Sequence, residues 1–192
     1  MVQSIKQQAS EPNFQAKKFI IWLFVVSSTI MFGGWTSYYI VFAASKGKGH
    51  GLVLPDLFIY STVVLVASSI CLFLASRAFK MGEIGFQKML LWVTMFLGLA
   101  FGYLQVDAWS SLYHSGAFLL NNNAAISMIY IVSGVHLLHI LVGLCMVLGC
   151  LLGAYGEIDI DRLRFRMEIS SIFWHFIDIL WIYLYVFLLL NS

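Results

Sequence analysis

The last apolar segment of the chain contains Phe173-Trp174-His175-Phe176-Ile177-Asp178-Ile179-Leu180-Trp181. His175 and Asp178 are three residues apart, so they share one face of a helix, although aromatic and aliphatic residues surround them. An ionisable side chain is costly among lipid tails and normally faces protein, a partner or water. The segment therefore predicts a membrane helix that carries a polar functional site.

The whole chain is strongly apolar. Of its 192 residues, 61% are hydrophobic and 10% are charged, and the mean hydropathy is +0.89. Such a chain cannot fold around a single soluble core without leaving apolar surface in water. The net charge of +2 is too small to indicate a nucleic-acid partner, and outside the loops no basic run with interleaved aromatic residues occurs. We therefore expect an integral membrane protein.

Five apolar stretches are long enough to cross a bilayer core, which needs about 20 residues. They cover residues 19–44, 57–76, 89–106, 124–155 and 170–190. We expect Asp56 to cap the second helix and Asn121-Asn122-Asn123 to cap the fourth. Residues 1–18 are expected to form a polar cytoplasmic tail, and residues 19–192 a single membrane domain. The predicted fold is all-α, an integral membrane bundle of five transmembrane helices.

Lys and Arg are distributed unevenly between the two sides of this bundle. Only Lys46 and Lys48 lie on one side. The other side has Lys6, Lys17, Lys18, Arg77, Lys80, Lys88, Arg162, Arg164 and Arg166. Because basic loops stay on the cytoplasmic side, we expect the N-terminus to be cytoplasmic and the C-terminus outside.

Two further histidines, His136 and His139, are three residues apart in the fourth stretch and share a face. With a rise of about 1.5 Å per residue, they fall in the same membrane layer as His175 and Asp178. We expect the two pairs to meet in one buried cluster, where the carboxylate would favour a protonated or donor imidazole. A structural or lipid-contacting hydrogen-bond cluster is the preferred interpretation, because these groups are few for a metal site. A redox-active metal or heme is the alternative.

Two pairs of glycines, Gly98 with Gly102 and Gly149 with Gly153, are each four residues apart. This spacing lets membrane helices approach closely, so these faces are expected to pack internally or to meet a partner subunit. The alternative is that they only reflect the frequency of Gly in membrane helices.

Three blocks of the sequence resemble subunit III of heme-copper terminal oxidases, the cytochrome c oxidase subunit 3 family. Residues 173–181, with Trp174 and Trp181, resemble its Tyr-Trp-His-Phe-Val-Asp-x-x-Trp signature, and residues 133–143 resemble Thr-Gly-Phe-His-Gly-x-His-Val-x-x-Gly. The third block, similar to Leu-Gly-x-x-Phe…Gln-x-x-Glu-Trp with Asp in place of Glu, contains Gly98-Leu99, Gln105, Asp107 and Trp109. The order and spacing match, so the resemblance covers the chain from about Phe19 to Leu190.

The resemblance implies a five-helix form of a non-redox subunit. Heme and copper then belong to subunits I and II, and no catalytic residue, cofactor or metal lies in this chain. The implied roles are to stabilise subunit I, to hold phospholipid and to sustain proton uptake. Partners would be subunits I and II, with small subunits or a larger respiratory supercomplex. The expected location is the bacterial cytoplasmic membrane, or alternatively the mitochondrial inner membrane.

One position departs from the family pattern. Residues 22–28 resemble Trp-Leu-Phe-x-x-Ser-Glu, but Ser28 occupies the carboxylate position. We therefore expect no role that requires an intramembrane glutamate at this position, whereas the hydroxyl can still bond a neighbouring backbone carbonyl.

Three functions remain open at this point. The favoured one is subunit III of a proton-pumping oxidase that takes electrons from cytochrome c and reduces dioxygen to water. The second is the same subunit in a quinol oxidase. The third is a small b-type cytochrome or membrane anchor in which His136, His139 or His175 ligates heme.

Overall fold

A computed structural model of the protein describes residues 14–46, 56–117, 124–156 and 159–190. These residues form five helices, all long and apolar enough to cross a membrane, and no strand occurs among them. The helices are α2 (Phe14–Lys46), α3 (Leu57–Met81), α4 (Ile84–His114), α5 (Ala124–Tyr155) and α6 (Ile160–Leu190). The predicted all-α bundle of five membrane helices is confirmed.

Most helices extend beyond the apolar spans that the sequence predicted. α2 begins at Phe14, five residues before the predicted span at 19, and α4 is longer than 89–106 at both ends. α6 begins ten residues before the predicted span at 170, whereas α5 coincides with 124–155. Apolar composition marks only the part of a helix that lies in hydrocarbon. The backbone hydrogen bonds continue into the more polar flanks, so the helix is longer than the span.

The predicted cap at Asp56 is wrong. Its side chain makes no capping hydrogen bond. Instead its backbone carbonyl accepts hydrogen bonds from the amides of Ile59 and Tyr60, at 3.0 and 3.3 Å. The predicted cap at residues 121–123 lies outside the described residues.

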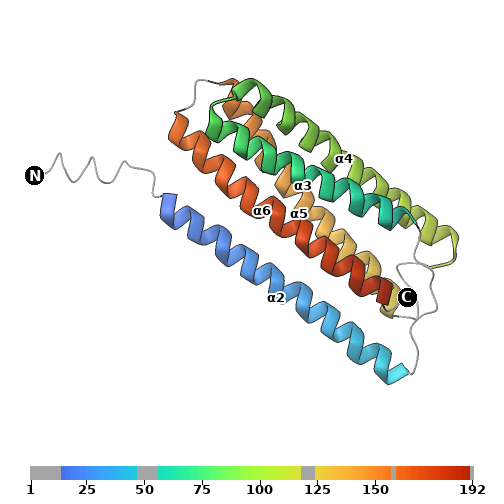
Figure 1. Ribbon diagram of the computed structural model, residues 1–192. Coiled ribbons are helices and arrows are strands. Elements are labelled where there is room, and N and C mark those ends of the chain that lie inside the picture. Colours follow the sequence, from blue (N-terminus) through green and yellow to red (C-terminus); the bar gives the residue numbers. More distant parts are fainter. Residues whose placement is uncertain (1–13, 47–55, 118–123, 157–158, 191–192) are drawn as a thin grey trace, which may run out of the picture.

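Helices α3 to α6 form a bundle, and α2 lies along one side of it (Figure 1). α2 packs against α5 and α6 and does not contact α3 or α4. Few of its side chains are buried, and large apolar residues such as Phe19, Ile30 and Val41 point outward. α2 is therefore the most peripheral of the described helices.

α3 and α4 form the most extensive helix pair, joined by a short turn at Gly82, whose φ is 80°. The buried positions of α4 follow one another at intervals of three and four residues, as in helices that pack side by side at a small angle. They include Gln87, Leu91, Thr94, Gly98, Phe101, Gln105, Ala108 and Leu112. This buried face of α4 thus includes the small residue Gly98 and the polar residues Gln87, Thr94 and Gln105.

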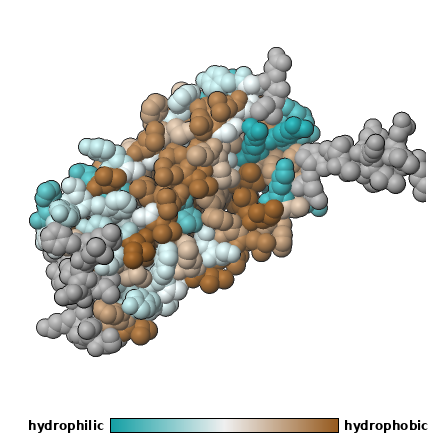
Figure 2. All heavy atoms as spheres, turned by 180° about the vertical axis from the view of Figure 1, so that it is seen from behind, coloured by the Kyte–Doolittle hydropathy of each residue, from teal (hydrophilic) through white to brown (hydrophobic). Residues whose placement is uncertain are grey.

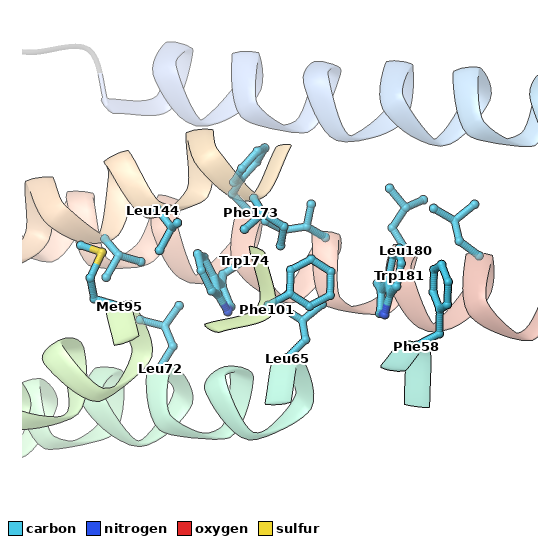
Figure 3. Packing of buried hydrophobic residues seen from close by; sticks show 14 of the residues in the cluster. Phe58, Leu65, Leu72, Met95, Phe101, Leu144, Phe173, Trp174, Leu180 and Trp181 are labelled. Carbon is cyan, nitrogen blue, oxygen red and sulfur yellow. The ribbon is translucent and has the colours of Figure 1, made fainter. Parts of the chain in front are cut away.

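The centre of the bundle is aromatic. Trp174 and Trp181 of α6 are fully buried and point between α3, α4 and α5 (Figure 3). The Trp181 ring contacts Phe58 and Phe101, with centroids 6.0 and 5.1 Å away. α6 therefore supplies the two largest side chains of the core.

The face of the molecule shown in Figure 2 has mainly hydrophobic side chains across its middle and more hydrophilic ones towards its ends. Basic residues from several helices gather at one end. Lys18 of α2 pairs with Glu168 of α6, and the Lys88 ammonium lies 4.3 Å from the centroid of the Tyr155 ring. These described basic residues, which were predicted to share one side of the membrane, therefore lie at one end of the bundle.

Candidate functional site

The two polar pairs of α5 and α6 lie at matching levels. A Cβ on Gly143 of α5 would lie 2.9 Å from the Trp174 ring of α6. Seven residues before Gly143 and seven residues after Trp174, the rings of His136 and Trp181 stack with their centroids 4.8 Å apart. This antiparallel register places His139 level with Asp178. The matching depth agrees with the prediction.

The predicted single cluster is nevertheless wrong. No hydrogen bond joins His136 or His139 to His175 or Asp178 in the structure, because the two pairs face different helices. His139 faces α2, whereas His175 faces α3. Depth follows from residue counting, but the rotation of a helix about its axis follows from its neighbours. The polar groups of the core are therefore divided into three sites.

The first site joins α2 to α5. Ser28 is buried, and its Oγ lies 3.2 Å from Nε2 of His139. Nδ1 of the same ring lies 2.8 Å from the Val135 carbonyl and donates to it. In a neutral ring Nε2 is then the acceptor, so the Ser28 hydroxyl donates. The hydroxyl thus bonds an imidazole rather than a neighbouring backbone carbonyl, which corrects the expectation from the sequence.

The second site is His136 in the aromatic core. Its side chain is fully buried, it stacks on Trp181, and it meets Phe101 edge-on at 5.8 Å. Neither ring nitrogen has a hydrogen-bond partner. Gln105 of α4 is also fully buried, and its amide oxygen and nitrogen are likewise without partners. Gln105 is one turn beyond Phe101, so the two unpartnered side chains lie at neighbouring levels of the core.

The third site joins α6 to α3. Nδ1 of His175 lies 2.6 Å from Oγ of Ser69, and the same hydroxyl interacts with the Asp178 side chain. Oδ1 of Asp178 has no partner. His175 is half-buried, whereas Asp178 and Ser69 are buried. Ser69 therefore stands between an imidazole and a carboxylate that are on one face of α6.

The motif tryptophans are hydrogen-bonded inside the bundle. Nε1 of Trp174 donates to Ser68 at 3.1 Å, and Nε1 of Trp181 donates to Thr62 at 3.0 Å. Nε1 of Trp109 donates to Ser133 at 2.9 Å. Asp107, in contrast, lies exposed on α4. Most of these motif residues therefore position helices in this chain.

The hydroxyl residues of α3 were not predicted from the sequence as site residues. Thr62, Ser68 and Ser69 provide the α3 partners of the polar groups of α6. A signal was present, because the pairs Ser61-Thr62 and Ser68-Ser69 are seven residues apart and so return to one face of the helix. Among the described residues, no group of three His, Cys, Asp or Glu side chains is arranged to hold a metal ion.

We expect Ser28→Ala to weaken the docking of α2. The change leaves the buried Nε2 of His139 without a donor, at a cost of about 1 kcal/mol of unfolding free energy. The measurement is the unfolding of the purified chain in mixed micelles with increasing denaturing detergent. Ser27→Ala, on the exposed neighbouring position, is the control and should leave the midpoint unchanged. Equal midpoints for the two variants would show that the Ser28–His139 contact contributes nothing.

These features define a class: a multi-pass membrane protein built as a helical bundle with internal tryptophan and histidine contacts. The chain matches the family model of cytochrome c oxidase subunit III over residues 10–192. It belongs to that family.

Similar proteins include three that are called cytochrome c oxidase subunit 3. The one from Osphranter robustus is 27% identical over 174 residues, which is 85% of this chain and 65% of that protein. The one from Balaenoptera musculus is 28% identical over the same shares. The one from Antidorcas marsupialis is 26% identical over 186 residues, which is 91% of this chain and 70% of that protein. The chain thus spans about two thirds of the length of these curated relatives.

Proposed function

We propose that this chain is the non-redox subunit III of a proton-pumping respiratory terminal oxidase that reduces dioxygen to water. The observation that carries the proposal is the family match over residues 10–192, together with a bundle that keeps the matched residues Trp174, Trp181, His136 and His139 in its interior. In this role the chain stabilises subunit I and sustains proton uptake.

The proposal places the redox centres in partner subunits. Heme and copper are held by subunits I and II, and this chain contributes helix surface rather than ligands. Its core supports such a role, because α6 links α2, α3 and α5 through polar and aromatic contacts. Small subunits or a respiratory supercomplex add further partners.

We also propose an orientation and a location. The end of the bundle that carries Lys18, Lys80, Lys88 and Arg164 faces the cytoplasm, following the distribution of positive charge. The N-terminus is then cytoplasmic, the C-terminus is outside, and the membrane is the bacterial cytoplasmic membrane. The mitochondrial inner membrane is the alternative.

A quinol oxidase is the alternative complex for the same subunit. The electron donor is determined by subunit II, so the two alternatives share every feature of this chain. Purifying the complex and finding a dinuclear copper motif in its subunit II would favour cytochrome c as the donor, and its absence would favour quinol.

Removing this chain is expected to affect the durability of the complex more than its first turnovers. Because the proposal gives the chain no redox ligands, the initial rate of dioxygen reduction should stay close to that of the intact complex, while activity decays faster during sustained turnover. Oxygen consumption by the complex, with and without added subunit, tests this. Immediate and total loss of dioxygen reduction in an otherwise assembled complex would contradict the proposal.

A basic cavity supports phospholipid binding as part of this function. It has a volume of about 460 Å³ and lies between the first turns of α2 and α6. Its lining consists of Phe14, Lys17, Arg162, Phe165, Arg166 and Ile169. Basic pockets between membrane helices at the cytoplasmic side suit anionic headgroups. We therefore propose that an anionic phospholipid binds here.

Arg162→Gln combined with Lys17→Gln should release this lipid. The two changes remove two of the three cations from the cavity, so less anionic phospholipid should co-purify with the complex, as measured by mass spectrometry of extracted lipids. Arg77→Gln, on exposed α3 surface outside the cavity, is the charge-matched control. An unchanged anionic lipid content in the double variant would refute the site.

A further inference from the structure

A polar seam runs between α3 and α6 towards the basic end of the bundle. We define the seam by Ser69, Ser76, Ser171, His175 and Asp178. Ser76 and Ser171 line a hollow of about 220 Å³ in it, together with the charged residues Lys80, Arg164 and Glu168. Oγ of Ser76 is buried without a partner. The seam therefore contains polar groups, such as Ser76 Oγ and Asp178 Oδ1, that find no hydrogen-bond partner within the described part of the chain.

His175 is more exposed than Ser69 and Asp178, the two polar residues of the seam that lie next to it. Its Nδ1 is held by Ser69 at 2.6 Å, and Phe73 flanks the ring with its centroid 6.5 Å away. Nε2 makes no hydrogen bond within the described part of the chain, and the side chain is half-buried. The Ser69 contact holds the ring through Nδ1, so Nε2 is left without a partner within the described residues.

Lipid tails cannot satisfy this nitrogen. They have no hydrogen-bonding atoms, and an unpaired polar group at membrane depth is unfavourable. A headgroup at the charged mouth of the hollow would lie near Arg164, which is eleven residues from His175, or about 16 Å along a helix. Glu168, the charged residue of this mouth that is nearest to His175 along α6, is still seven residues away, or about 10 Å. A headgroup held by these charges therefore lies about two helical turns or more from His175.

We propose that the face of α3 and α6 around His175 is a docking surface for a transmembrane helix of a partner subunit, and that a hydroxyl or amide side chain of that helix hydrogen-bonds His175 Nε2. The inference rests on the proposed function, because it requires assembly with other membrane subunits. A hydroxyl or amide both donates and accepts, so it pairs with Nε2 in either protonation state of the ring.

The surface around His175 suits a helix. Ile70 and Phe73 of α3 and Ile179 of α6 are exposed by 56%, 54% and 66%. They flank the half-buried ring with apolar side chains, while Ser69 and Asp178 lie beneath it. Packing by an apolar helix with one polar side chain matches this pattern, since single polar groups join membrane helices by hydrogen bonds.

Photo-crosslinking in the assembled oxidase complex tests the location of this surface. A photoreactive amino acid replaces Ile179 in one variant and Tyr103 in another. Tyr103 is 74% exposed on α4 and is the control. We expect the probe at 179 to crosslink to an oxidase subunit and the probe at 103 to lipid. Crosslinks to an oxidase subunit from 103, with only lipid adducts from 179, would overturn the inference.

Two substitutions at His175 test the hydrogen bond. In His175→Asn the amide can replace Nδ1 towards Ser69 but does not extend to the Nε2 position, whereas in His175→Gln the longer side chain reaches it. We expect His175→Asn to bind the partner subunit about tenfold more weakly, as one lost hydrogen bond predicts, with the detergent unfolding midpoint of the isolated chain unchanged. His175→Gln should bind more tightly than His175→Asn.

The outcomes separate the inference from the proposed function. Equal retention of the partner by wild type, His175→Asn and His175→Gln would overturn the hydrogen bond while leaving the proposed function intact. A density map of the complex with only water or lipid at Nε2 would overturn the docking surface. Failure of the wild-type chain to co-purify with any oxidase subunit would overturn both.

Discussion

Trp181→Ala should destabilise the bundle by about 3–5 kcal/mol, the range for removing a buried Trp. The indole contacts Phe58, Phe101 and His136, and its Nε1 donates to Thr62. Its removal leaves a cavity between α3, α4, α5 and α6 that these neighbours cannot fill without moving. It also leaves His136 without its stacking partner. The midpoint of detergent-induced unfolding, followed by tryptophan fluorescence or circular dichroism, measures the loss.

Trp22→Ala provides the matched control for this experiment. Trp22 lies on α2 and is 49% exposed, so its removal opens a surface that lipid or detergent fills. We expect a change in unfolding free energy of less than about 1 kcal/mol. If Trp22→Ala destabilised the chain as much as Trp181→Ala, the central packing of Trp181 would not be what stabilises the bundle.

The number and kind of helices followed from the sequence because lipid imposes a simple rule. A span needs about 20 apolar residues, and every backbone polar group must be satisfied within the helix. Residues 124–155 meet both conditions without interruption, and α5 has those bounds. The start of α2 at Phe14 was not predictable in this way, because its first two turns are held by contacts of Phe14 with Phe165 and of Lys18 with Glu168. Such contacts join residues that are far apart in the sequence.

The candidate site was predictable in its residues and its depth but not in its pairing. Counting residues placed His139 level with Asp178, which the register of α5 and α6 reproduces. The rotation of each helix depends on where its bulkiest side chains fit, and the two tryptophans of α6 point between α3, α4 and α5. His175 is thereby directed to Ser69 on α3. Spacing within one helix cannot reveal this, because it contains no information about the neighbouring helix.

Trp174, the other buried tryptophan of α6, packs against two glycines, Gly98 and Gly143. A Cβ on Gly98 of α4 would lie 2.9 Å from the Trp174 ring, and a Cβ on Gly143 of α5 would lie 2.9 Å from the same ring and 3.0 Å from Ile177. Trp174 thus occupies a slot between two glycine backbones, and its Nε1 is held by Ser68. The predicted internal packing of Gly98 is confirmed, whereas a Cβ on Gly149 would meet nothing within 4 Å.

Gly143→Ala should therefore destabilise the chain, although Ala is the better helix former by roughly 0.5–1 kcal/mol. The Trp174 indole is packed between the backbones of Gly98 and Gly143 and has no room to move. The overpacking should therefore lower the unfolding free energy by about 1–3 kcal/mol, which outweighs the gain in helix propensity. Gly149→Ala is the control on the same helix, and because its Cβ meets open space it should raise the unfolding free energy of the isolated chain. The two variants are expected to shift the detergent unfolding midpoint in opposite directions. Shifts of the same sign would mean that Trp174 can move to accommodate the added methyl group. The close packing of Trp174 between Gly98 and Gly143 would then not determine how α4, α5 and α6 pack.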